Sequence, residues 1–304
     1  MKQPLPISDF RPPCTRVLLR AFSLIEILVV VALLSVIIIG LMAMFSQVQK
    51  AFRTGLTQTD VLEAGRVAGD MFGRELEQIT PANQSGYNFY ARIPYDAATY
   101  STPFVQPLPG STIGRTNLIY DLFFVAKRNQ DWVAIGYFVR TNNLQTGALG
   151  LSPLGVGTLY RFETNAAATS GRSVSNLFNE FSLARLNEQR ATKVVDGVVH
   201  FKVRTFDTNG AWMHTNQSLS INAKYANYNA NQVGGEIELY EFWSNAVPGT
   251  VELEMGLLED KVWQRFKALP TAVAQTRYLT NQAGRVHLFR QRVSVRNVDS
   301  VAYQ

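Results

Sequence analysis

Cysteine is almost absent from this chain of 304 residues. Cys14 is the only one, which excludes an intrachain disulfide and a multi-cysteine metal site. The three histidines, His200, His214 and His287, are too far apart in sequence for metal-ligand spacing. Phosphate loops, dinucleotide fingerprints, serine-hydrolase motifs and zinc-protease motifs are all missing. We therefore expect no catalytic residues, no metal, no cofactor and no enzymatic activity.

One short segment imitates a metal loop. Asp207, Asn209 and Gly210 are spaced like the start of a calcium loop, but the remaining ligands are missing. Asp and Asn before Gly are common turn formers, so the segment predicts a turn.

Charge is sparse and unevenly placed. Charged residues make up 17% of the chain, and the formal net charge is +6. Residues 1–21 supply 4 − 1 = +3 of it, from Lys2, Arg11, Arg16 and Arg20 against Asp9. The remaining 25 basic and 22 acidic residues give another +3, spread along the chain. This mild balance does not predict nucleic-acid binding.

An apolar run follows the basic leader. No charged residue occurs from Ile27 to Phe45, and only Ser35 and Gly40 interrupt the hydrophobic side chains. Residues 22–45 would span about 36 Å as a helix, which is enough to cross a bilayer core. The run is longer than the h-region of a secretory signal, and Leu41-Met42-Ala43 is a poor cleavage site. A signal anchor with a cytoplasmic N-terminus fits better.

Glu26 is the residue that a plain anchor leaves unexplained. A carboxylate at the centre of a membrane helix costs roughly 3 kcal/mol, and such residues are usually partnered and functional. The simplest alternative is that Glu26 lies about one turn from the interface and reaches water by snorkelling.

The residues around Glu26 carry a family resemblance. Arg20-Ala21-Phe22-Ser23-Leu24-Ile25-Glu26-Ile27-Leu28-Val29-Val30 resembles the type IV prepilin signal shared by type IV pilins and type II secretion pseudopilins. The resemblance implies cleavage between Ala21 and Phe22 by a prepilin peptidase, which is also the N-methyltransferase of Phe22. It also implies that Glu26 corresponds to the glutamate that the family has as the fifth residue of the mature protein. Ala21 stands where the family normally has Gly.

This arrangement is physically coherent. Cleavage would create an α-amine on Phe22, which is largely cationic at neutral pH. A Glu26 carboxylate in low dielectric needs a cation, and the amine of an adjacent subunit can supply it. Subunits could therefore assemble only after cleavage has created this amine.

The chain beyond the membrane segment predicts a longer helix and a β-rich head. Helical spacing of apolar residues continues to Pro81, so we expect one helix over residues 22–80, with residues 22–45 transmembrane. Gly65, Gly69 and Gly73 recur every fourth residue and predict close packing on one helix face. Residues 118–125 and 132–139 predict a hairpin, and further strands are expected at 158–163, 194–206, 250–257 and 286–295. Short helices are expected at 173–183 and 260–268. We therefore expect an α+β fold class. The resemblance implies a pilin-like arrangement, with residues 1–21 as leader and 81–304 as extracytoplasmic head.

Three head segments extend the resemblance. Residues 194–204, 206–212 and 245–253 are similar to J-type minor pseudopilins and W-type minor pilins, and pilin-like cassette proteins of Verrucomicrobia are another relative. Residues 81–115 and 213–235 have little period and are expected to be solvated loops.

The resemblance, together with the large head, implies a minor structural subunit of a type IV pilus or type II secretion pseudopilus. It would lie in the inner membrane as a single-pass protein, with its head in the periplasm or, after assembly, outside the cell. Its partners would be the prepilin peptidase, other pilin or pseudopilin subunits and inner-membrane lipid. The rival hypothesis is a non-polymerising, membrane-anchored extracytoplasmic binding protein, and a secreted protein with a cleaved signal peptide comes third.

Overall fold

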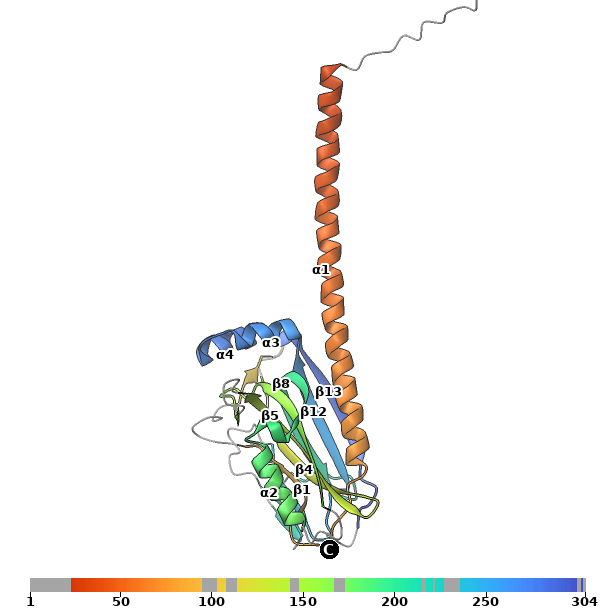
Figure 1. Cartoon of the computed structure of the whole chain (residues 1–304), viewed down its shortest axis with the longest axis vertical. Helices are drawn as coiled ribbons and strands as arrows, with labels where there is room; N and C mark the ends of the chain where they lie inside the picture. Colours follow the sequence, from red (N-terminus) through yellow and green to blue (C-terminus); the bar gives the residue numbers. More distant parts are fainter. Residues whose placement is uncertain are drawn as a thin grey trace, which may run out of the picture. The chain divides into compact units, whose positions relative to one another are not determined.

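The computed structural model describes residues 23–94, 103–107, 114–142, 148–166, 173–214, 217–220, 222–226, 236–299 and 302. The chain divides into two compact units, residues 1–54 and 55–304. The first unit contains, among its described residues, only the beginning of a long helix. The second contains the end of that helix and the β-rich head (Figure 1).

The long helix α1 covers Leu24–Leu76. At 1.5 Å per residue its 53 residues correspond to about 80 Å of helix. It ends before Thr80, because Ile79 forms a β-bridge with Ala126 and the Thr80 amide donates to the Val125 carbonyl. The chain thus joins the sheet before it reaches Pro81.

The head is built on one curled antiparallel sheet, which has eleven strands within the described ranges. The strand order is β13-β12-β8-β7-β5-β4-β1-β11-β10-β9, with β6 paired to β5. The strands are β1 (Tyr87–Arg92), β4 (Asp121–Arg128), β5 (Asp131–Asn142), β6 (Leu149–Gly150), β7 (Gly157–Ala166), β8 (Thr192–Phe206), β9 (Gln217–Ser220), β10 (Ala223–Ala226), β11 (Leu239–Trp243), β12 (Thr250–Leu258) and β13 (Val286–Ser294). A separate two-stranded ribbon pairs β2 (Val105–Gln106) with β3 (Arg115–Thr116).

The sheet is buried on both faces at its centre. Because side chains alternate along a strand, Leu122 and Phe124 of β4 join the core beneath α1, while Phe123 and Val125 join a second core on the other face. Helix α2 (Val174–Ala184) covers that second core. Gly136 makes room for it, since a Cβ there would lie 2.3 Å from the Phe181 ring.

Two further helices close one end of the sheet (Figure 1). These are α3 (Asp260–Lys267) and α4 (Ala272–Asn281), and the single turns η1 (Glu188–Arg190) and η2 (Ala283–Arg285) precede β8 and β13. Val262, Trp263 and Phe266 of α3 form a third, smaller apolar cluster with Leu258 and Leu279.

The α+β class expected from the sequence is confirmed at this level: a long apolar helix precedes a strand-rich head. The hairpin is confirmed as β4 and β5, with Leu122 opposite Tyr137. Every other strand and short helix expected by its residue range is present, with ends that agree within three residues. The regions expected to be loops contain β1, β2, β9 and β10, however, and α4 and β11 were not anticipated.

Candidate functional site

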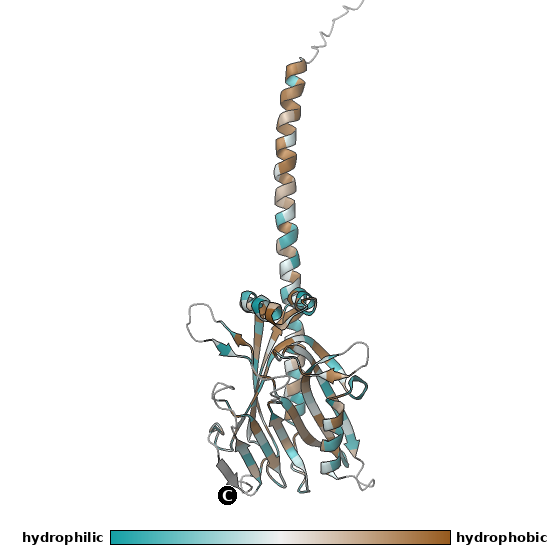
Figure 2. Cartoon of the chain, turned by 90° about the vertical axis from the view of Figure 1, so that its left-hand side faces the viewer, coloured by the Kyte–Doolittle hydropathy of each residue, from teal (hydrophilic) through white to brown (hydrophobic). Residues whose placement is uncertain are grey.

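The first part of α1 is long and apolar enough to cross a membrane. Figure 2 shows this stretch coloured almost uniformly as hydrophobic. Within the described residues of the first unit its large apolar side chains are exposed, as in Leu24, Ile39 and Met42, which are 83%, 67% and 71% accessible. Removing each such side chain from water is worth roughly 1.5 to 3 kcal/mol. This surface is therefore stable only when lipid or other apolar helices cover it.

Glu26 lies in the first turn of α1, on its exposed surface. Its backbone N–H donates to the Ser23 carbonyl oxygen at 3.0 Å and to Ser23 Oγ at 3.2 Å. Ser23 and Glu26 thus have the spacing of a capping box, in which the serine occupies the N-cap and the acid occupies N3. A carboxylate is also favoured there by the helix dipole. The expected cleavage-site residues Ala21 and Phe22 lie outside the described residues.

The glycine stripe of α1 lies against the edge strand β13. A Cβ on Gly65 would lie 2.1 Å from Phe289 Cζ, and one on Gly73 would lie 2.4 Å from Gln291 Nε2. Gly69 also faces Gln291, with 3.2 Å between its hypothetical Cβ and Oε1. The absence of side chains on this stripe is what lets helix and strand approach.

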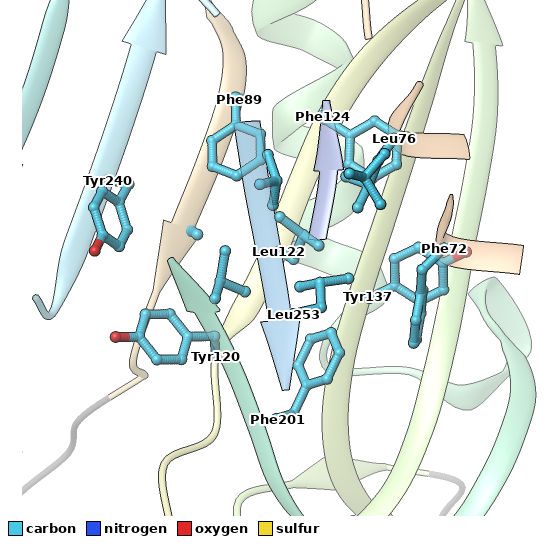
Figure 3. Packing of buried hydrophobic residues seen from close by; sticks show 14 of the residues in the cluster. Phe72, Leu76, Phe89, Tyr120, Leu122, Phe124, Tyr137, Phe201, Tyr240 and Leu253 are labelled. Atoms are coloured by element: carbon cyan, nitrogen blue, oxygen red, sulfur yellow. The ribbon is translucent and has the colours of Figure 1, made fainter. Parts of the chain in front are cut away.

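The neighbouring face of α1 enters the main core. Figure 3 shows Phe72 and Leu76 among aromatic and aliphatic side chains of the sheet. The Phe72 ring packs edge-on against Tyr137, with 4.7 Å between ring centroids, and lies 5.7 Å from the Phe201 ring. Such edge-to-face pairs add about 0.5 to 1.5 kcal/mol beyond burial. The helix end is thereby fixed on the head.

Beside this core Glu75 forms an ion pair with Arg161 and a hydrogen bond with Tyr137, and we call these three residues the Glu75 lock. Arg161 donates to Glu75 Oε1 from Nε at 3.0 Å and from Nη2 at 2.7 Å, and the Tyr137 hydroxyl donates to Oε2. Burial, with the Glu75 charge in second place, raises the pKa of Tyr137. Burial alone would lower the pKa of Arg161, but its hydrogen bonds to Glu75 and Glu163 raise it. Arg161 therefore keeps its positive charge beside Glu75 at neutral pH.

The sheet face opposite α1 carries a network of charges over β8, β12 and β13. Lys202 Nζ lies 2.7 Å from Glu254, Arg204 Nε donates to Glu236 at 2.9 Å, and Arg290 Nη2 donates to Glu252 at 2.8 Å. Each carboxylate has a cation beside it. Such pairing offsets the cost of burying these groups on the sheet.

His200 ends this network in the interior. Its ring is 1% exposed, and its Nδ1 accepts a hydrogen bond from the Leu118 amide at 3.1 Å. Nε2 lies 3.5 Å from Glu254 Oε2. Burial lowers the pKa of His200. The pKa of Glu254 is held well below its usual range, mainly by its contact with His200 and next by its contact with Lys202. His200 is thus a neutral hydrogen-bond acceptor that holds the backbone at Leu118, and its buried ring is not accessible to a substrate.

The segment that imitates a calcium loop is a turn, as expected. Asp207 Oδ1 accepts from the amides of Asn209 and Ala211 at 2.9 and 2.8 Å, and Gly210 has a φ of +81°. Among the residues that the structure describes, no group of three His, Cys, Asp or Glu side chains could hold a metal ion.

The charge network and the Glu75 lock were missed by sequence reasoning. A signal for the network exists: Lys202 and Arg204 alternate with apolar residues in one strand, and Glu252 and Glu254 do so in another. Alternation of this kind marks one face of a sheet. Glu75 gives no such signal, because its partners Tyr137 and Arg161 belong to distant strands.

Comparisons of the chain with known protein families, with curated proteins and with solved structures give no match.

Proposed function

We propose that this chain is a structural minor subunit of a type IV pilus or type II secretion pseudopilus. The prepilin peptidase would cut it after Ala21 and methylate Phe22, and the apolar part of α1 would then pack among the helices of neighbouring subunits. The observation that carries the proposal is the order of residues 20–30, in which one acid follows a basic leader and opens an uninterrupted apolar helix.

The exposed apolar surface of α1 supports this role. Side chains from Leu24 to Phe45 need a nonpolar cover, which lipid supplies before assembly and neighbouring helices supply within a filament. Glu26 would pair with the Phe22 amine of an adjacent subunit. Opposite charges attract strongly in hydrocarbon, and the attraction is greatest when the two groups are in contact, so this pair would set the axial register between helices.

The size of the head favours a position at the filament tip. Residues 55–304 form one unit with an eleven-stranded sheet among its described residues. A head of this bulk fits at a filament end more easily than in repeated helical packing. Gold labelling of the head should therefore mark filament ends, and labelling along whole filaments would contradict the tip position.

A membrane-anchored binding protein is the second candidate, and one observation favours it. Ser23 Oγ accepts a hydrogen bond from the backbone N–H of Glu26, so the helix is capped at this position without any partner subunit. The two functions are separated by asking whether Glu26 is needed for its charge or for its place in the cap.

The decisive variant is Glu26→Gln, because glutamine also fits the N3 position of a capping box but carries no charge. Ser23→Ala is the matched control, since it removes the cap and retains the charge. Both would be expressed with the filament machinery, and sheared filaments would be blotted for the subunit. We expect Glu26→Gln to insert in the membrane and fail to enter filaments, while Ser23→Ala enters them. Normal incorporation of Glu26→Gln would refute the assembly role.

A further inference from the structure

Among the strands that the structure describes, β13 ends the sheet, and one of its two backbone edges has no neighbouring strand. Its register with β12 is regular over all nine residues from Val286 to Ser294, and the next residue, Val295, donates from its N–H to the Gly249 carbonyl oxygen at 3.1 Å. Inward and outward groups alternate in an antiparallel ladder. The N–H and C=O groups of Leu288, Arg290 and Arg292 therefore point away from β12. None of them has a backbone partner within the described ranges. An unbroken edge of this kind is a template for another strand.

A groove runs beside this edge. It has a volume of about 470 Å³ and lies between α1 and β13, lined on the helix side by Leu62, Gly65 and Arg66 and on the strand side by Leu288 and Phe289. Leu62 and Leu288 are 51% and 46% exposed, which is high for large apolar side chains. A strand added at the edge would direct every second side chain toward α1 and this groove. Those side chains should be apolar.

The other face of the edge favours carboxylates. Between residues 283 and 297 there are four arginines and no acid. The Arg290 side chain is 57% exposed although it pairs with Glu252. Arg292 lies over the Phe206 ring at 3.9 Å, and no described carboxylate lies within 4.0 Å of it. Both guanidinium groups turn toward the inside of the sheet, Arg290 to Glu252 of β12 and Arg292 to Phe206 of β8. The alternate side chains of an added strand would lie on the same face of the sheet as these two arginines.

The strand already paired with the inner edge of β13, β12, shows which residue pattern suits a neighbour of this strand. Glu252 and Glu254 of β12 lie opposite Arg292 and Arg290. Between and beside them, Val251, Leu253 and Met255 enter the core under α1. The partner on the inner edge is thus a strand of alternating acidic and apolar residues.

We propose that the free edge of β13 binds an extended segment of another protein in which acidic and apolar residues alternate. Its backbone would pair with Leu288, Arg290 and Arg292. Its apolar side chains would fill the groove beside Leu62, and its carboxylates would face the arginines. A second copy of this chain is a poor occupant, because antiparallel self-pairing about Arg290 places arginines opposite or diagonal to one another. The proposal holds whether or not the chain enters a filament.

The test uses the full chain in detergent micelles and a labelled synthetic peptide that copies residues 250–256 of β12. Fluorescence anisotropy should show saturable binding. A peptide with both glutamates replaced by lysine should bind at least about tenfold more weakly. Residue-level hydrogen exchange should show that the peptide protects the amides of Leu288, Arg290 and Arg292, and leaves those of Phe289 and Gln291 unchanged.

Leu288→Pro removes one outward N–H at a position where a strand edge tolerates proline. Leu288→Ala is the matched control, since it shortens the side chain and keeps the N–H. We expect at least about a tenfold loss of affinity for the proline variant and little loss for alanine. Equal binding by both variants, absence of peptide binding, or dimerisation of the chain through β13 would overturn the proposal. Should Leu288→Pro fail to fold, the exchange pattern of the unmodified chain decides alone.

Discussion

Gly65→Ala is the sharpest test of how α1 is attached to the head. The new Cβ would lie 2.1 to 2.4 Å from three ring atoms of Phe289, closer than packed carbon atoms ever approach. The ring meets the helix end-on, so it must move away or push the helix from β13. Gly55→Ala is the matched control, because no atom lies within 4 Å of its hypothetical Cβ.

The magnitude follows from two opposing terms. Replacing glycine by alanine inside a helix gains about 1 kcal/mol through helix propensity. Overpacking a tight contact costs about 1 to 3 kcal/mol. We expect Gly55→Ala to stabilise the protein by up to about 1 kcal/mol. For Gly65→Ala the 2.1 Å approach puts the steric term at the upper end of its range, about 2 to 3 kcal/mol. After the gain in propensity we expect a net loss of about 1 to 2 kcal/mol.

Thermal unfolding of the full chain in detergent, followed by tryptophan fluorescence, measures both effects. For a unit of this size 1 kcal/mol corresponds to about 2 to 4 °C, so Gly65→Ala should lower the Tm by about 2 to 8 °C. Phe289→Val supplies a double-mutant cycle, because a shorter side chain removes the clash. The two substitutions should then couple favourably by about 1 kcal/mol or more. A Gly65→Ala protein as stable as Gly55→Ala, with no coupling to position 289, would refute the close packing of α1 on β13.

Two further predictions concern the buried polar groups. Glu75→Leu leaves Arg161 with only Glu163 as a partner and leaves the Tyr137 hydroxyl without its acceptor. Denaturant unfolding should therefore show that the free energy of unfolding falls by about 2 to 3 kcal/mol, against about 1 kcal/mol for Tyr137→Phe. Equal losses for the two variants would contradict the role given to Glu75. The lowered pKa of His200 means that the folded state binds a proton less tightly than the unfolded state. The contribution of His200 to stability is therefore fully present above pH 6.5 and is lost as the pH drops below it. His200→Asn should flatten this slope in a Tm series against pH, and an unchanged slope would assign it to other groups.

The sequence predicted the parts of the fold that have strong local patterns. The hairpin was recognisable from two apolar runs around a polar turn, and the near-continuous apolar character of β4 and β5 reflects burial on both sheet faces. Strands β1 and β11 lacked a comparable signal. Their central positions depend on pairing with each other, Tyr90 opposite Glu241, across about half of the chain. No local pattern encodes such distant pairing.

The candidate site was predictable to a different extent in each part. The glycine stripe follows from spacing alone, whereas Glu26 is singled out by its place in an apolar run and by the family resemblance. The capping role of Ser23 could have been read from its position three residues before Glu26, but the family resemblance drew attention to the acid alone. The free edge of β13 could not be predicted, since edge position is a property of the complete strand order.

The mass of the mature protein tests the central claim most directly. The chain would be expressed in a host with an active prepilin peptidase, purified from membranes and analysed by intact-mass and N-terminal peptide mass spectrometry. The account predicts loss of residues 1–21 and a methylated amine on Phe22. A protein that retains Met1 and the whole leader under these conditions would contradict it.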